Sequence, residues 1–352
     1  MLYFDVTKVS GQSHRSGIVR VSQCLRHELA RLAGGGMTEV AWSDHDAAFV
    51  GAARGVPIEA GPGDWVLTPE LFSEHERPGM SAWLVSRSCR AAALYHDSIP
   101  LQYPEFTWPQ SVTRHPHYLK MLACFDLVIA NSNASAREIW SYWDWLGIRT
   151  PELISIALGA DGATRHRVTK PDPAHVLRTS VVMIGILEPR KNQEAVLDAA
   201  EVLWSEGLKF SLSFAGRVNP HFGKAVAERI RDLRSQGQAV RHLSDLADAE
   251  IAGLLREARF SVLPSLAEGC GLPVLESLWA GVPVVCSDIP ALSETAVRGG
   301  CRLVAPGDLA ALITTMRALL KDNAAVMRLA GEASASRLPT WTDAAQAILA
   351  TL

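Results

Sequence analysis

The stretch RFSVLPSLAEGCGLPVLESLWAGVPVVCSD, residues 259–288, decides the fold. It contains an apolar run at 259–265, a glycine-bearing loop, a helical stretch at 274–280 and a second apolar run at 282–288. Neither run alternates apolar with polar residues, which is typical of strands buried on both faces of a parallel sheet. Strand, loop, helix and strand in this order predict a βαβ unit.

The same pattern fills the second half of the chain. Further strands are expected at SVVMIGIL (180–187) and LKFSLSFAG (208–216), with helices at 193–206, 221–236 and 247–258. The first half repeats it less regularly, with strands LYFDV, EVAW, DWVLT, AAALYHD, FDLVIANS and ELISIAL and helices IVRVSQCLRHELARL, ASAREIWSYW and one near 114–124. We therefore expect an α/β fold of two Rossmann-like domains, with parallel sheets facing across a cleft.

The segment GADGATRHRVTKPDPAHVLRTS, residues 159–180, is rich in Gly, Pro and charge and is predicted to link the two domains. A chain of 352 residues has the length of two domains. We expect an acceptor-binding domain over 1–165 and a donor-binding domain over 166–335. A C-terminal helix over 336–352 is expected to pack back on the first domain.

Composition excludes several classes of protein. The chain has 34 basic and 37 acidic residues, a net charge of −3, which argues against a nucleic-acid binder. Its six cysteines form no Cys-x-x-Cys pair, so we expect no zinc site, no disulfide framework and a reducing, cytoplasmic location. The sequence has no signal peptide or long apolar run, which disfavours secretion and membrane spanning. Peripheral contact with the inner membrane face stays open, as does the oligomeric state.

The loop after Pro264 is predicted to bind phosphate. A helix is expected to begin at Pro273, where a proline leaves no orphan amide. Backbone amides before and after it are expected to face an anion, assisted by the helix dipole. The loop follows the carboxyl end of a strand, where ligands bind in open parallel sheets. The predicted donor-binding residues of this segment are Gly269, Cys270, Gly271, Leu272 and Val274.

Two carboxylates flank this loop. Glu268 lies in the loop and Glu276 lies one turn into the helix, with seven residues between them. Carboxylates accept paired hydrogen bonds from vicinal hydroxyls, which suits a sugar and a ribose on either side of a diphosphate. Spacing alone would equally describe a solvated helix face, but the glycine loop and the strand before it favour a binding role.

The segment AEGCGLPVLESLWAGVPVVCSDIPALSE resembles the E-x7-E signature of the retaining glycosyltransferases of family four, which have the two-Rossmann GT-B fold. SGIVRV, ALYHDSIP, LVIANSNASAREI, GILEPRKN and FAGRVN extend the resemblance, in order, along nearly the whole chain. The resemblance implies that Glu268 contacts hydroxyls of the donor sugar and that Glu276 holds the nucleotide ribose. It also implies a retaining, metal-independent reaction in which the nucleotide sugar is a substrate and no cofactor is needed.

Arg190 and Lys191 in GILEPRKN lie where a strand ends and a helix begins. They are predicted to offset the charge that develops on a leaving diphosphate. Their structural alternative is a solvated helix start, but two cations there oppose the helix dipole. Many family members carry an Arg directly after the strand glycine. Here Ile186 follows Gly185, so Arg190 is expected to take over that contact.

The first half supplies the remaining candidates. His96 ends the strand AAALYH and is a candidate for proton transfer or for bonding a sugar hydroxyl near neutral pH. The family places a cleft histidine here, although a lone histidine is often purely structural. Asp97 and Arg20 are candidates for acceptor binding. Further candidates for the donor pocket stand at strand ends or before a helix: Gly17, Gly216 and Arg217.

Together these features predict transfer of a hexose or deoxyhexose from a nucleotide diphosphate sugar to a saccharide or lipid-linked saccharide acceptor. Residues 276–304 resemble bacterial mannosyl-, rhamnosyl- or fucosyltransferases of surface polysaccharide synthesis, which favours a GDP-linked donor. Alternatives are a sugar-nucleotide epimerase or phosphorylase of related fold, or a non-catalytic subunit that binds sugar nucleotides. The first strand is not followed by Gly-x-Gly-x-x-Gly, which argues against a dinucleotide cofactor.

Overall fold

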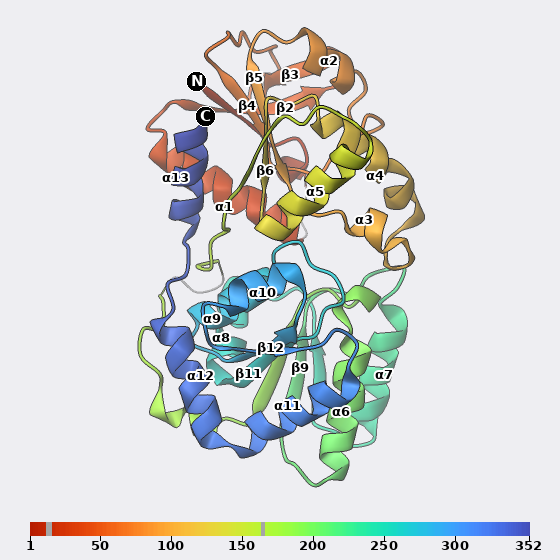
Figure 1. Cartoon of the computed structure of the whole chain (residues 1–352), viewed down its shortest axis with the longest axis vertical. Coiled ribbons are helices and arrows are strands. Elements are labelled where there is room, and N and C mark those ends of the chain that lie inside the picture. Colours follow the sequence, from red (N-terminus) through yellow and green to blue (C-terminus); the bar gives the residue numbers. More distant parts are fainter. Residues whose placement is uncertain (12–15, 163–165) are drawn as a thin grey trace. The chain divides into compact units, whose positions relative to one another are not determined.

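The computed structural model describes residues 1–11, 16–162 and 166–352. The chain divides into two compact units (Figure 1), Met1–Gly159 with Thr340–Leu352, and Ala160–Pro339. The predicted boundaries, after residues 165 and 335, lie a few residues from these divisions, and residue 165 itself is outside the described residues.

The first unit is built on a seven-stranded sheet of order β3-β2-β1-β4-β5-β6-β7. Every neighbouring pair is parallel except β2 with β3, an antiparallel edge pair that the sequence analysis did not include. Full burial of β4 and β6 explains their continuous apolar sequence. The strands are β1 Leu2–Asp5, β2 Met37–Ser43, β3 Ala48–Gly51, β4 Trp65–Thr68, β5 Arg90–Tyr95, β6 Leu127–Ala130 and β7 Glu152–Ser155.

Helices cover the first sheet. On one face, side chains from α2, α4 and α5 pack against β2, β4, β5 and β6. The helices are α1 Gly17–Leu32, α2 Met80–Ser86, α3 Ile99–Gln102, α4 Pro109–Leu122, α5 Asn133–Trp145 and α13 Trp341–Thr351, with short 3-10 turns η1 Val9–Gly11 and η2 Pro104–Phe106. The hydroxyl of Ser16 caps α1 by accepting a hydrogen bond from the Val19 amide at 3.2 Å.

The last helix, α13, packs along α1 although more than 300 residues of sequence separate them. Thr342 donates a hydrogen bond to Glu28 at 2.8 Å, and Arg31 donates to the Thr342 hydroxyl at 3.2 Å. A capping box of Thr340 and Asp343 starts the helix. The end of the chain is thereby a part of the first unit.

The second unit has a six-stranded, all-parallel sheet of order β10-β9-β8-β11-β12-β13. Four of its strands match the expected apolar runs, and β10 and β13 were not foreseen because they are short and partly exposed. The strands are β8 Ser180–Ile184, β9 Ser211–Ala215, β10 Val240–Leu243, β11 Ala258–Leu263, β12 Val284–Ser287 and β13 Cys301–Val304.

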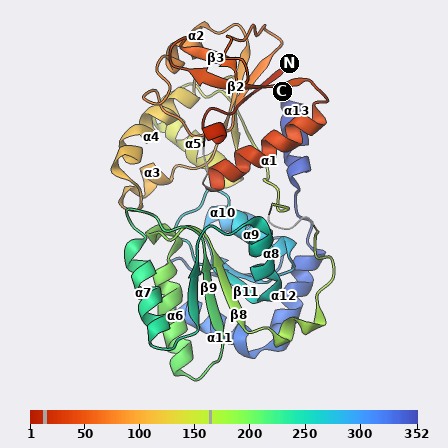
Figure 2. The same ribbon diagram turned by 180° about the vertical axis from the view of Figure 1, so that it is seen from behind.

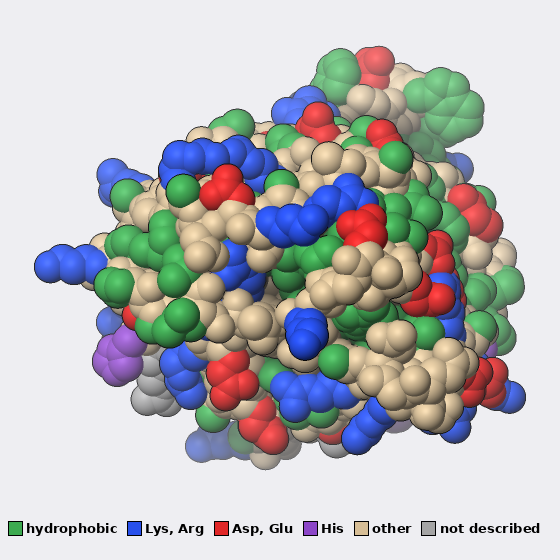
Figure 3. Space-filling view, turned by 90° about the horizontal axis from the view of Figure 1, so that it is seen from below, with side chains coloured by type: hydrophobic (Ala, Val, Ile, Leu, Met, Phe, Trp, Pro, Cys, Tyr) green, Lys and Arg blue, Asp and Glu red, His purple; other side chains and the backbone are tan. Residues whose placement is uncertain are grey.

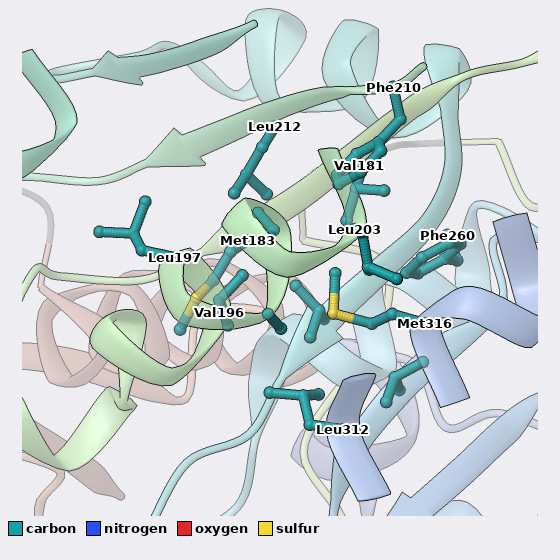
Figure 4. Packing of buried hydrophobic residues seen from close by; sticks show 14 of the residues in the cluster. Val181, Met183, Val196, Leu197, Leu203, Phe210, Leu212, Phe260, Leu312 and Met316 are labelled. Carbon is teal, nitrogen blue, oxygen red and sulfur yellow. The ribbon is translucent and has the colours of Figure 1, made fainter. Parts of the chain in front are cut away.

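The core of the second unit shows why its strands do not alternate. Val181 and Met183 of β8 pack into a cluster with side chains of α6 and α11 (Figure 4), whereas Val182 packs with α8 on the opposite face. Figure 2 shows helices on both sides of this sheet. They are α6 Gln193–Ser205, α7 Lys224–Ser235, α8 Asp248–Glu257, α9 Leu272–Trp279, α10 Pro290–Ala296, α11 Leu309–Lys321 and α12 Asn323–Ala335, with 3-10 turns η3 Pro173–Leu177 and η4 Pro189–Lys191.

Both sheets have the doubly wound strand order of a Rossmann fold. The order reverses between β1 and β4 in the first unit and between β8 and β11 in the second. In such sheets ligands bind outside the carboxyl ends of the strands at this switch point. The segments after β8 and β11 are therefore the first place to look for a site in the second unit.

The surface carries no large field of one charge on the face that Figure 3 shows. Lys and Arg side chains are interspersed there with Asp and Glu, and apolar side chains lie between them. This mixed pattern agrees with the near-balanced composition and gives this face no resemblance to a nucleic-acid-binding surface.

Candidate functional site

The turn after β8 brings two cations to the switch point of the second unit. Arg190 and Lys191 belong to the 3-10 turn η4. Asn192, with a φ of 61°, ends this turn and is the N-cap of α6. The carbonyl of Arg190 accepts a hydrogen bond from the Leu266 amide at 2.7 Å, and the Asn192 amide group donates to the Pro264 carbonyl at 3.3 Å. These bonds tie the turn to the loop that follows β11.

Both cations converge on Glu268 of the neighbouring loop. The Lys191 ammonium contacts Glu268 Oε1, and Arg190 Nη1 lies 3.2 Å from Glu268 Oε2. Ser265 also donates a hydrogen bond to Glu268 Oε1 at 2.8 Å. The side chains of Lys191 and Glu268 are each 7% exposed, whereas that of Arg190 is 21% exposed. Of the two cations, Arg190 is the more accessible.

The close pairing shapes the electrostatics of these groups. Burial alone would raise the pKa of Glu268, but Lys191 and Arg190 outweigh it and hold the pKa below its ordinary value. Glu268 is therefore an anion at neutral pH. Burial lowers the pKa of Lys191, and the Glu268 carboxylate opposes that change. The ion pair and the Ser265 hydroxyl together keep this charge stable in a buried place.

The loop after β11 leads into α9, but the helix begins one residue earlier than predicted. Gly271 is the N-cap with a φ of 78°, Leu272 is the first helical residue, and Pro273 is the second. A β-carbon on Gly271 would lie 2.3 Å from Leu292, so only glycine fits. The helix start therefore presents the Gly271 and Leu272 backbone beside the Glu268 loop.

The structure corrects the prediction for Val274. Its amide donates to the Gly271 carbonyl at 2.9 Å, and its side chain is fully buried with Leu275 and Leu278. The amide is thus engaged inside the first turn of the helix, so Val274 is a core residue that does not offer its amide to an anion.

Three other predicted residues lie in the same loop and helix. Gly269 is buried, and Cys270 is half-buried, with burial raising the pKa of its thiol to about 12. Such a thiol is no nucleophile at neutral pH. Glu276 lies in the second turn of α9 and is 3% exposed.

Gly216 and Arg217 follow β9, the neighbour of β8. A β-carbon on Gly216 would lie 2.2 Å from the Gly185 carbonyl oxygen, which gives this glycine a packing reason independent of any ligand. The Arg217 carbonyl accepts a hydrogen bond from the Leu187 amide at 2.9 Å, and its side chain is exposed. Both residues adjoin the β8 turn through the backbone.

In the first unit, His96 lies at the end of β5 and is 6% exposed. Its Nε2 lies 2.9 Å from the Pro69 carbonyl, which can only accept, so Nε2 carries the hydrogen and Nδ1 is left as an acceptor. Burial lowers the pKa of His96, so the ring is neutral near pH 7. Only Nδ1 is then available to take a proton or a hydroxyl hydrogen bond.

The other predicted residues of the first unit lie at two places. Asp97 directly follows His96, and Gly17 and Arg20 lie at the start of α1. Asp97 is half-buried, and its carboxylate accepts a hydrogen bond from the Ile99 amide at 3.1 Å. Gly17 is the first residue of α1, is exposed, and would have nothing within 4 Å of an added β-carbon. Arg20, one turn on, is half-buried. Ser22 of α1 donates to the Pro69 carbonyl at 3.4 Å, the same oxygen that His96 uses.

Sequence reasoning missed two sets of buried charges. Glu188 precedes the two cations and pairs with Arg190, and the acidic residue before Pro-Arg-Lys was the signal that could have found it. In the first unit Arg77 bridges Asp5 at 2.6 Å and Glu70 at 2.8 Å, all three almost completely buried. Nothing local in the sequence joins these three positions.

Over 1–11, 16–162 and 166–352, no three His, Cys, Asp or Glu side chains are placed to hold a metal ion together. Within the same ranges, no helix has the length and apolar character needed to span a membrane.

Comparison with known proteins places these observations in a family. Residues 178–322 match the family model described as Glycosyl transferases group 1. The O-antigen chain mannosyltransferase B of Escherichia coli is 34% identical over 265 residues, which cover 72% of this chain and 67% of that protein. The serotype-specific mannosyltransferase WbdA of E. coli is 28% identical over 253 residues, or 66% of this chain. The chain spans about a third of the length of WbdA, 30% in this alignment.

Solved structures agree on the fold over nearly the whole chain. WaaG, a glycosyltransferase involved in lipopolysaccharide biosynthesis, matches with a TM-score of 0.68 at 14% identity, covering 99% of this chain and 98% of that one. Anabaena HepE, solved in complex with UDP-glucose, matches with a TM-score of 0.69 at 16% identity, covering 100% and 99%. The GT-B fold and the family resemblance expected from the sequence are confirmed. The chain belongs to the group 1 glycosyl transferases.

Proposed function

We propose that this protein transfers a hexose or deoxyhexose from a nucleoside diphosphate sugar to a saccharide or lipid-linked saccharide acceptor. The observation that carries the proposal is the convergence of Arg190 and Lys191 on Glu268 at the switch point of the second unit. Beside them stands the glycine-capped start of α9. Cations and a helix N-terminus at one edge of a sheet form a site suited to a diphosphate.

In this proposal the donor lies on the second unit. Arg190 and the α9 start offset the negative charge that develops on the leaving diphosphate, and Lys191 holds Glu268 in place for the donor sugar hydroxyls. Glu276 binds the ribose of the nucleotide. Gly269, Cys270 and Leu272 contribute loop backbone, and Gly216 and Arg217 border the site at the adjacent strand end.

The acceptor lies on the first unit in this proposal, near His96, Asp97 and Arg20. The neutral imidazole of His96 offers Nδ1 to an acceptor hydroxyl. Gly17 leaves open space at the start of α1 for a phosphate group. The reaction is retaining and needs no metal, with attack on the same face as the departing diphosphate. Orientation and phosphate stabilisation then supply most of the rate enhancement.

The names of two relatives support the choice of sugar and pathway in this proposal. Both E. coli relatives are named mannosyltransferases, and one is named for O-antigen chains, which favours a GDP-linked hexose and cell-surface polysaccharide synthesis. We place the protein in the cytoplasm, with peripheral contact at the inner membrane face where a lipid-linked acceptor would lie.

Thermal-shift titration with GDP, UDP, dTDP and their sugars tests the donor. A nucleotide that binds only the folded chain raises the melting temperature by mass action. We expect one nucleoside diphosphate series to do so and Arg190→Gln to weaken the shift. Arg231→Gln, on an exposed part of α7, is the matched control and should behave as the native protein. No shift with any sugar nucleotide would contradict the proposal.

Activity assays separate the alternatives. Product that grows only with a saccharide acceptor supports transfer. Turnover of the donor alone would indicate an epimerase, and a requirement for inorganic phosphate would indicate a phosphorylase. Binding without turnover, combined with a biological role that survives Glu268→Gln, would indicate a non-catalytic subunit.

A further inference from the structure

Glu188 is a buried carboxylate that the proposed reaction has not yet used. It lies in the segment between β8, which ends at Ile184, and α6, and it is the N-cap of the η4 turn that carries Arg190 and Lys191. Its side chain is 10% exposed. A buried carboxylate needs partners for its oxygens, because an unpaired charge in such a place is costly.

Both oxygens of Glu188 have partners of known identity. Oε1 lies 2.6 Å from Arg190 Nε, and Oε2 accepts a hydrogen bond from Asn219 Nδ2 at 3.1 Å. Its backbone amide donates to the Gln193 side-chain carbonyl at 3.3 Å. With both oxygens engaged and little surface exposed, Glu188 is poorly placed to touch a substrate.

Asn219 fixes the direction of this carboxylate. Its Oδ1 accepts hydrogen bonds from the backbone amides of His221 and Phe222, at 3.0 and 3.3 Å. Backbone amides only donate, so the oxygen must face them and the Nδ2 group must face Glu188. The backbone amide of Asn219 also donates a hydrogen bond to the Leu187 carbonyl at 3.1 Å, which ties the loop after β9 to the turn after β8.

The guanidinium of Arg190 is thereby held at two edges. The Glu188 carboxylate forms an ion pair with Nε. Nη1 donates hydrogen bonds to Glu268 at 3.2 Å and to the Ala267 carbonyl at 3.1 Å. An arginine held by several bonds loses its freedom before a ligand arrives, so binding does not have to order it.

We propose that Glu188, held by Asn219, is a positioning residue that orients Arg190 toward the diphosphate in the transition state. The proposal rests on the proposed function. It assigns Glu188 an indirect role: it touches Arg190 and leaves contact with the donor to that side chain. It predicts that the effect of changing Glu188 passes through Arg190 and through no other route.

A double-mutant cycle with Glu188→Gln and Arg190→Gln tests the proposal. Glu188→Gln keeps the shape of the side chain but removes the charge from its bond to Arg190. We expect kcat to fall about 10- to 100-fold because Arg190 loses the carboxylate that faces its Nε, with KM for the donor changing much less. In the Arg190→Gln background the same substitution should change kcat less than about threefold.

Asn219→Ala gives a second, milder route, since it frees Glu188 without removing its charge, and kcat should fall about three- to tenfold. Glu194→Gln is the matched control, because Glu194 lies on α6 and pairs with the half-exposed Arg229 on α7. Melting temperatures of all variants show whether each one folds.

Equal losses of kcat from Glu188→Gln in the native and Arg190→Gln backgrounds would overturn the positioning role, while the proposed function would stand. Failure of the native protein to bind any sugar nucleotide would overturn the proposed function itself. Should Glu188→Gln not fold, Asn219→Ala in the two backgrounds decides the question by the same comparison.

Discussion

The two units carry buried charge clusters at equivalent places, where the strand order of each sheet reverses, and the clusters are built differently. In the first unit Arg77 stands between Asp5, at the end of β1, and Glu70, just after β4. In the second unit Arg190 and Lys191, after β8, meet Glu268, after β11. Topology has thus brought charged side chains to the same edge twice.

The difference lies in what the carboxylates and the cations face. Glu70 accepts hydrogen bonds from the Lys8 and Val9 amides at 2.8–2.9 Å, and the Arg77 guanidinium lies 4.7 Å from the centre of the Phe72 ring. Arg77 is completely buried, whereas Arg190 keeps a fifth of its side chain in solvent. The first cluster is closed on itself and braces the β1 loop, whereas the second keeps part of one cation in solvent.

The largest effect is expected from breaking the first cluster. Arg77→Met leaves Asp5 and Glu70 buried without a cation, so the free energy of unfolding should fall by about 3–5 kcal/mol. Urea denaturation measures it. Arg31→Met, which breaks an exposed pair with Glu28 on α1, is the control and should cost less than about 1 kcal/mol. A loss below 1 kcal/mol for Arg77→Met would mean that the first cluster is not a brace.

Breaking the second cluster should damage activity more than it damages the fold. Lys191→Met removes a cation from Glu268, and we expect sugar transfer to fall about 100- to 1000-fold, or roughly 3–4 kcal/mol in the activation barrier. Steady-state kinetics and urea denaturation are measured together. Lys224→Met, at an exposed position on α7, should leave both unchanged. If Lys191→Met folds and still transfers sugar at the native rate, the second cluster is not part of the catalytic site.

The pH dependence of stability sharpens the contrast. Burial, and then repulsion from Asp5, raises the pKa of Glu70 to about 7, while Arg77 opposes the change. A carboxyl whose pKa is raised in the folded state stabilises the fold at low pH, and this contribution, up to about 3 kcal/mol, is lost as pH rises from about 4.5 through 7. Glu70→Gln should remove that loss.

Unfolding measured from pH 5 to 8 checks this expectation. Glu138→Gln is the comparison variant, because burial and Asp97 raise the pKa of Glu138 to about 7 as well, and its contribution has the same sign. The fall in the free energy of unfolding with rising pH should become less steep in Glu70→Gln and in Glu138→Gln. It should be least steep in the variant that carries both substitutions. An unchanged slope in Glu70→Gln would show that Glu70 stays ionised in its cluster.

The smallest effect is expected at Gly17. Substituting this residue tests whether a phosphate group also binds at the switch point of the first unit. An added β-carbon would meet nothing within 4 Å, so Gly17→Ala should leave the stability unchanged or slightly higher. If a diphosphate approaches this backbone, the methyl group should weaken donor binding about tenfold, or roughly 1.4 kcal/mol. Calorimetric titration of the donor measures it, and unchanged affinity would exclude Gly17 from the donor site.

Much of this organisation could be predicted from residue patterns. Runs such as 259–265 do not alternate apolar with polar residues because both faces of β11 are covered, and glycine loops at strand ends marked the helix starts. The rule that parallel strands end at one edge of a sheet predicted that the loops carrying Glu268 and the two cations are neighbours, but the ion pairs between them are visible only in the structure.

What could not be predicted depends on contacts between distant positions. Asp5, Glu70 and Arg77 look like ordinary surface residues in sequence, and only the order of β1 and β4 brings them together. Helix α9 begins at Leu272, after Gly271 in a left-handed conformation with a φ of 78°, and the position of that residue relative to Pro273 is not encoded in the residue pattern. That shift engages the Val274 amide within the helix and removes it from the anion site.

The pairing within the second cluster has a consequence for product release. Glu188 and Glu268 offset Arg190 and Lys191, so the four formal charges sum to zero before any nucleotide arrives. A diphosphate then meets fixed dipoles and an already balanced set of ions, and the net attraction is weaker than two bare cations would exert. If the proposed function holds, we expect the spent nucleotide to be bound weakly and turnover to respond only slightly to added salt.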